Sequence, residues 1–332
     1  MELLNKLTQI SAVSGNEERI CEFITNEVKG FADEVYTDRL NNVIAVKKSK
    51  NKDAKKLMLS AHTDEIGIIV TYIEKDGFLR FAPVGGISLF NSINKRVVFS
   101  NGTTGIVSYE EKIDIKKDLK PAKMYIDIGA QDFEKAASLV SVGDTAVFEG
   151  AFYDMNGRVS AKALDDRVGV YALIKAFTDL NDTAFDIYAV FSSQEEIGLR
   201  GAKTAAYTIK PDYALAIDVT DTGDTPNCNV MDVKLGGGVC IKFKDNSIIT
   251  HKKINDALIK CAQKNNIPFQ REVLSIGGTD AGSIHLTRGG VVTGALSIPT
   301  RYIHSPCEVA DVKDIKGCIN LIKCFAKENY FD

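Results

Sequence analysis

Four continuous apolar runs constrain most strongly what this 332-residue chain can fold into. Each run is long enough for a strand and shows little polar alternation, which is typical of strands buried on both faces of a sheet. Segments with apolar residues at helical spacing lie between them, for example residues 170–177 and 254–266. This alternation predicts an α/β fold, a mixed sheet covered by helices. The four runs are LMLSAH (57–62), AFDIYAVFSS (184–193), PDYALAIDVT (211–220) and GGVVTGALSIP (289–299).

The pattern changes between about Gly67 and Asn156. Short β-rich runs are separated there by Gly, Asn and Asp, and only residues 132–140 have a helical pattern. We therefore expect a small β-rich domain (67–156) inserted into a discontinuous α/β domain formed by residues 1–66 and 157–332.

The N-terminal region contains a possible helix start. Ser14 and Glu17 have the spacing of a capping box, in which each side chain would bond to the other residue's backbone amide. Apolar residues then recur at helical spacing from Ile20 to Val28. The pattern predicts an amphipathic helix that follows this capping box.

Composition excludes several classes of protein. The formal net charge is −3, with acidic and basic residues intermixed, so no basic face suggests nucleic acid as a partner. No apolar run reaches 18 residues and no signal peptide is recognisable, so we expect no membrane association and a cytoplasmic location. The seven cysteines lack CxxC spacing and are expected to be reduced thiols.

Polar residues that could carry chemistry fall where the predicted strands end or pass into helices. Any one of them has a structural explanation, such as a helix cap or a turn. Together they should meet at one edge of the sheet, where ligands bind in open α/β folds. Two histidines and several carboxylates suit a pair of divalent ions such as Zn or Co, with one more carboxylate free to act as a base. These residues are His62, Asp165, Glu195, Glu196, Asp218 and His304.

Six motifs, in order and spacing, resemble the M42 family of dinuclear metallo-aminopeptidases. The resemblance covers essentially the whole chain, and six ordered motifs are far more specific than one short pattern. The motifs are SAHTDEIG (60–67), KALDDRVG (162–169), SSQEEIGLRGA (192–202), AIDVTD (216–221), GGTDAGSIHLTRGG (277–290) and IPTRYIHSP (298–306).

The resemblance implies a role for each candidate residue. His62 and Asp218 would hold one metal, Glu196 and His304 the other, and Asp165 would bridge both, with Asp166 as the alternative bridge. Glu195 would be the general base, and Asp64 would orient the His62 imidazole. A cis peptide bond between Asp165 and Asp166 is also implied. The cofactors would be two divalent ions per subunit, Zn or Co by preference and Mn as a third candidate.

The same resemblance implies the reaction and the partners. The substrates would be peptides with a free N-terminus, attacked by a metal-activated water. The inserted domain would form dimers, and the dimers would assemble into a homo-oligomeric tetrahedral dodecamer. Two alternatives remain: a glycoside hydrolase, because family members often carry an endoglucanase label, and a related dinuclear deacylase or carboxypeptidase. The N-terminal residue that is preferred cannot be predicted from the motifs.

Overall fold

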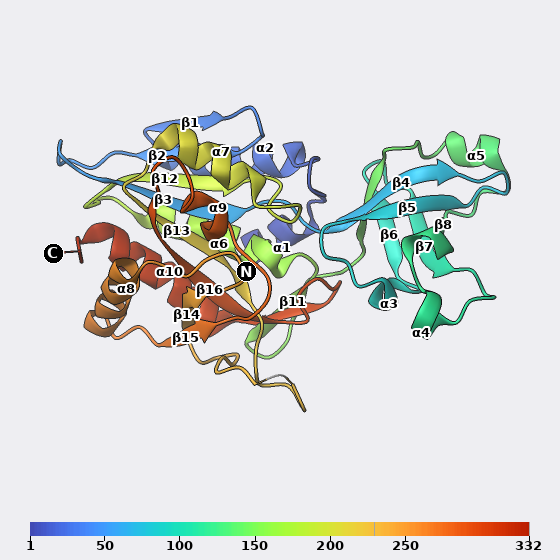
Figure 1. Ribbon diagram of the computed structural model, residues 1–332. Coiled ribbons are helices and arrows are strands. Elements are labelled where there is room, and N and C mark those ends of the chain that lie inside the picture. The colour runs from blue at the N-terminus through green and yellow to red at the C-terminus, as the bar shows by residue number, and fades with distance from the viewer. Residues whose placement is uncertain (229, 332) are drawn as a thin grey trace.

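The structure is a computed structural model that describes residues 1–228 and 230–331. It consists of a large α/β body and a smaller β-barrel that lies beside it (Figure 1). Both chain ends lie in the large body, so the barrel is reached from the middle of the chain (Figure 1). The predicted α/β fold with a mixed sheet covered by helices is confirmed.

An 11-stranded sheet forms the centre of the large body. Along its main path the order is β1 (Glu34–Thr37), β2 (Val43–Lys47), β12 (Asp186–Ser192), β3 (Lys56–His62), β13 (Tyr213–Thr220), β16 (Val292–Arg301), β17 (Glu308–Asp311), β11 (Arg158–Ala161) and β10 (Tyr153–Asp154). Off this path, β14 (Val239–Lys244) pairs with β16 and with β15 (Phe269–Val273). The four apolar runs of the sequence are the central strands β3, β12, β13 and β16.

These four central strands run parallel to one another, which determines where their ends lie. Ser192 at the end of β12 is opposite His62 at the end of β3. Asp218 in β13 is opposite Ser297 in β16. The residues that follow these strands therefore gather at one edge of the sheet, as expected for parallel strands.

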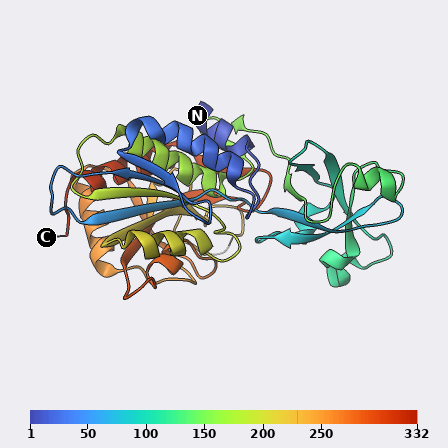
Figure 2. The same ribbon diagram turned by 90° about the horizontal axis from the view of Figure 1, so that it is seen from above.

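Helices cover both faces of the sheet (Figure 2). The larger core packs one helical layer against the sheet and includes Leu59, Phe177 and Phe325. That layer consists of α1 (Glu2–Gln9), α2 (Glu18–Val28), α6 (Leu164–Asp179), α8 (Lys252–Lys264) and α10 (Val312–Lys327), and a 3-10 turn, η1 (Lys29–Phe31), follows α2. On the opposite face lie α7 (Arg200–Ile209) and α9 (Ala281–Ile284), packed over a smaller core.

The predicted N-terminal helix is present, but its predicted capping box is wrong. The Ser14 hydroxyl donates to Asp64 (2.6 Å) instead of accepting an amide of the helix. Glu17 accepts from the amides of Gly15 (2.8 Å) and Gln194 (3.1 Å). Both side chains are drawn away from the helix start because they connect this segment to the ends of β3 and β12.

The barrel closes through six antiparallel strands around its own core. Apolar side chains such as Ile68, Phe81 and Ile126 fill its interior. The first and last strands pair, with Ile68 opposite Ala146. Around the barrel the order is β4 (Gly67–Ile73), β5 (Leu79–Val84), β8 (Met124–Asp127), β7 (Thr104–Tyr109), β6 (Arg96–Phe99) and β9 (Thr145–Phe148).

Short helices connect the barrel strands. They are α3 (Leu89–Ser92), α4 (Ile115–Asp118), the 3-10 turn η2 (Pro121–Lys123) and α5 (Phe133–Ala137), which falls in the stretch with a helical pattern. After β9 the chain returns to the main sheet through β10, which pairs with β11. Among the described residues no helix has the length and apolar character needed to cross a bilayer.

Candidate metal centre

His62, at the end of β3, has one ring nitrogen fixed by the backbone. Its Nδ1 donates to the carbonyl oxygen of Asp64 (3.2 Å), which leaves the lone pair on Nε2. This Nε2 faces two carboxylates, lying 3.0 Å from Oδ1 of Asp165 and 3.9 Å from Oδ1 of Asp218. The side chain is buried. A lone pair that faces carboxylates is repelled by them unless a proton or a metal cation lies between them.

His304 is arranged in the same way on the other side of Asp165. Its Nδ1 donates to the carbonyl of Gly86 (2.8 Å), a residue that follows barrel strand β5. Its Nε2 lies 3.2 Å from Oδ2 of Asp165 and 3.2 Å from Oε2 of Glu196. The Asp165 carboxylate therefore lies between the Nε2 atoms of two histidines.

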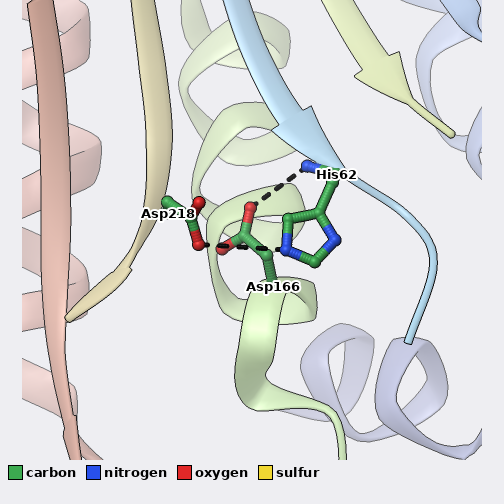
Figure 3. Close-up of side chains that lie close together, drawn as sticks. All are labelled: His62, Asp166 and Asp218. Atoms are coloured by element: carbon green, nitrogen blue, oxygen red, sulfur yellow. Dashed lines mark hydrogen bonds and ion pairs between the residues drawn. The ribbon is translucent and has the colours of Figure 1, made fainter. Parts of the chain in front are cut away.

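Asp165 and Asp166 lie in the first turn of α6, but neither has helical backbone angles. Their peptide bond is cis, as the resemblance implies. Asp166 accepts from the amides of His62 (3.2 Å) and Gly169 (3.1 Å). Figure 3 shows the Asp166 carboxylate between His62 and Asp218. A Cβ at position 169 would lie 2.2 Å from Asp166 Oδ1, so glycine is needed there.

The buried carboxylates of this cluster lack sufficient positive charge from the protein. Burial raises the pKa of Asp218 well above its usual value, and the neighbouring Asp165 raises it further. Burial also raises the pKa of Glu196, whose Oε1 has no hydrogen-bond partner among the described residues. Burial would lower the pKa of His304, but Asp165 and Glu196 raise it to about 12. The raised pKa values of Asp218, Glu196 and His304 all show that protonation is favoured in this buried group of carboxylates. A bound cation would be favoured there for the same reason.

Two overlapping groups of side chains could each hold a metal ion. In each group the ligand atoms lie within 4.8 Å of one another. The groups are His62, Asp166 and Asp218, and His62, Asp165 and Glu196. The donor set of imidazole nitrogen and carboxylate oxygen suits Zn, Co or Mn. The residues present therefore fit a metal centre.

Glu195 differs from Glu196 in its contacts, because Glu196 lies beside His304. The Glu195 carboxylate lines the same cavity, yet it makes no hydrogen bond or ion pair within the described part of the chain. Burial raises its pKa well above the usual value for a glutamate. The backbone instead holds it in place, because its amide donates to Oδ1 of Asp64 (3.0 Å).

Asp64 does more than the resemblance suggests. Its Oδ1 lies 3.4 Å from Nδ1 of His62, close enough to orient the ring. The same carboxylate accepts from the amides of both Glu195 and Glu196 and from the Ser14 hydroxyl. It thus fixes the ends of β3 and β12 relative to each other.

Sequence reasoning missed Glu308, in β17. Its Oε2 accepts from the amide of Asp165 (2.9 Å), and its Oε1 accepts from the amide of His304 (2.8 Å). The side chain is buried. The His304 contact is local, four positions away, but the contact with Asp165 joins residues 143 positions apart, and no local pattern could have revealed it.

A cavity of about 510 Å³ opens beside the cluster. The candidate residues His62, Asp165, Glu195, Glu196, Asp218 and His304 all line it. The rest of the wall comes mainly from the segments after β12, β13 and β15. The structure thus brings together every residue predicted to bind metal, with space for a ligand beside them.

Comparison with known proteins defines the class first: a family model described as M42 glutamyl aminopeptidase matches residues 41–321. The chain belongs to this family, and it is an aminopeptidase. An Acetivibrio thermocellus protein described as "Putative aminopeptidase" is 52% identical and covers 97% of this chain and 96% of its own length.

Solved structures agree over the whole chain. The aminopeptidase APDkam598 from Desulfurococcus kamchatkensis is 39% identical with a TM-score of 0.95, and the match covers 99% of this chain and 94% of that one. The Pyrococcus horikoshii TET1 peptidase, described as able to assemble into a tetrahedron or a large octahedral shell, is 37% identical with a TM-score of 0.88. That match covers 99% of both chains.

Proposed function

We propose that this aminopeptidase uses two divalent metal ions bound on either side of Asp165. The supporting observation is the position of the Asp165 carboxylate between the Nε2 atoms of His62 and His304. Each histidine has its Nδ1 committed to a backbone carbonyl, so each Nε2 is available as a ligand.

In this proposal His62 and Asp218 hold one ion, and Glu196 and His304 hold the other. Asp165 is preferred to Asp166 as the bridge because its two oxygens face different histidines. The Asp166 oxygens, in contrast, each accept a backbone amide. Asp166 then stabilises the start of α6 and the His62 backbone.

When bound, such ions would supply a water of lowered pKa and polarise the peptide carbonyl. Glu195 would take the proton of the attacking water and deliver it to the leaving amine, since its carboxylate is unpaired and lines the cavity. Asp64 would keep Glu195 and Glu196 pointing in different directions by binding both backbone amides. The substrates would be peptides with a free N-terminus.

A glycoside hydrolase would use a pair of carboxylates and no histidines. In this chain both histidines face carboxylates in one cluster. A glycoside hydrolase has no use for histidines in that position. The aminopeptidase relatives likewise disfavour a deacylase or a carboxypeptidase.

We also propose that the inserted domain, predicted as residues 67–156 and containing the β4–β9 barrel, is a dimerisation domain and that dimers build a tetrahedral shell. Large apolar side chains exposed on the barrel support this, including Tyr72 and Phe90. The assembly described for the P. horikoshii peptidase supports the shell. Seven free cysteines suit a reducing compartment such as the cytoplasm.

The test is a panel of amino-acid p-nitroanilides, assayed before and after chelation and after each of Zn, Co and Mn is added back. We expect chelation to abolish cleavage and at least one ion to restore it. Failure of every metal-loaded sample to cleave any member of the panel would refute the proposed function. The metal content of the active sample should be two ions per chain.

A further inference from the structure

The cavity beside the metal centre has a second wall that the proposed chemistry does not use. Apolar residues form most of it: Leu199, Val219, Leu274, Ile276 and Ile303. Among the described residues that line the cavity there is no lysine or arginine. Asp221 is the acidic lining residue outside the proposed metal and base positions.

Asp221 is only half-buried, and its carboxylate has no hydrogen bond or ion pair within the described residues. Asp224, three residues later, is different, because Arg301 holds it with contacts of 2.7 and 3.0 Å. In the loop after β13, Arg301 thus pairs with the Asp224 carboxylate, while Asp221, on the cavity wall, has no such partner within the described residues.

The buried cation of this region is already paired. Lys242 lies 2.5 Å from Glu272 and 3.6 Å from Asp245. Its side chain is 1% exposed and does not line the cavity. Lys242 therefore cannot bind a substrate carboxylate, and within the described part of the chain its ion pairs are with Glu272 and Asp245, not with Asp221.

We propose that Asp221 selects peptides whose N-terminal residue has a cationic side chain, lysine or arginine. This inference rests on the proposed metal-dependent function of the same cavity. The methylenes of such a side chain would pack on the apolar wall, and its charged end would pair with Asp221. An acidic N-terminal residue would be repelled by Asp221, because no lysine or arginine among the described lining residues offsets the two negative charges. A purely apolar residue would fit the wall but leave a desolvated carboxylate unpaired.

Asp221 could instead bind the α-ammonium group that every aminopeptidase substrate carries. Asp221 would then pair with the same kind of positive charge, but its effect on kcat/KM would not depend on the side chain of the N-terminal residue. Comparing lysine with norleucine separates the two roles, because norleucine has the same unbranched carbon chain without the ε-ammonium group.

The experiment measures kcat/KM of the metal-loaded enzyme on the p-nitroanilides of lysine, arginine, norleucine and glutamate. We expect a lysine-to-norleucine ratio of about 10 to 100, the range that one charge-assisted hydrogen bond supplies. Asp221→Asn should reduce this ratio to within about threefold of one. Asp221→Lys should reverse the charge preference and raise the glutamate-to-norleucine ratio.

Asp232→Asn is the matched control, since it removes one exposed acid from the same loop and does not line the cavity. Its lysine-to-norleucine ratio should equal that of the wild type. A wild-type ratio of one or less overturns the inference and leaves the proposed metal-dependent function standing. An equal fall for lysine and norleucine in Asp221→Asn overturns it in favour of α-ammonium binding. Absence of cleavage of every substrate refutes both proposals together.

Discussion

The backbone amides of Asp165 and His304 are bound by the two oxygens of a single carboxylate, that of Glu308. The two residues are proposed ligands from different parts of the chain, and Glu308 sets the distance between them. A second buried carboxylate, Asp64, does the same for Glu195 and Glu196. Four proposed site residues are thus positioned through their backbones by two acids that need not touch a metal.

Glu308→Gln should weaken metal binding. An amide side chain has one acceptor oxygen, so one of the two backbone N–H groups would lose its partner. Loss of such a supporting contact typically lowers metal affinity by about 10- to 100-fold. Competition with a metal-binding dye measures this. Glu149→Gln is the control because Glu149 lies on the surface beside Arg96, and its affinity should be that of the wild type.

Glu195→Gln should separate catalysis from metal binding. The amide keeps the shape of the side chain but cannot accept the proton, so we expect kcat to fall by about 10²- to 10⁴-fold. Metal content, measured by elemental analysis, should remain at the wild-type level because the Glu195 carboxylate is not a proposed ligand. Near-normal turnover in this variant would show that another group is the base.

Asp165→Ala should reduce the number of metal ions retained after dialysis. As the proposed bridge, Asp165 would serve both ions, and its loss would leave Glu196 and His304 as the remaining side chains of the second site. We expect elemental analysis to find fewer than two ions per chain. Retention of two tightly bound ions would instead favour Asp166 as the bridge.

Glu17 gives a prediction about pH. Burial raises its pKa to about 7, and the nearby Asp64 charge contributes to the increase. Because the pKa in the folded state exceeds the usual value of 4.5, ionisation of Glu17 opposes folding. This penalty is absent below pH 4.5, grows as the pH rises through 7 and is then constant.

Glu17→Gln removes that charge and keeps an oxygen that can accept from Gly15 and Gln194. We expect the variant to gain about 1–3 kcal/mol of unfolding free energy over the wild type at pH 8, and much less at pH 5. Denaturant unfolding at both values measures the difference. Glu18→Gln, at an exposed neighbour, should show no such pH-dependent gain. An equal gain at both pH values would contradict the burial of an ionised Glu17.

Much of this structure could be predicted from local sequence patterns. Long apolar runs identified the central strands, and polar residues just beyond them identified the edge where His62, Glu195 and Glu196 meet. These features are encoded by residues close together in the chain, so their physical meaning is visible without coordinates.

The contacts that position the site could not be predicted in this way. Ser14 and Glu17 had the right spacing for a helix cap, yet each makes a longer-range contact that competes with capping. Glu308 and Asp64 act by accepting backbone amides, which every residue except proline offers, so the sequence does not specify their partners. Only the tertiary fold determines which amides they bind.

The pairing of the first and last barrel strands has a consequence for folding. A long stretch of chain separates His62 from Asp165, and closing so large a loop costs conformational entropy. Because β4 pairs with β9, a folded barrel brings its own two ends together. Once the barrel is folded, the chain between His62 and Asp165 connects the two parts of the large body over a short distance. Barrel formation before sheet closure would therefore lower the entropy lost when His62 and Asp165 meet.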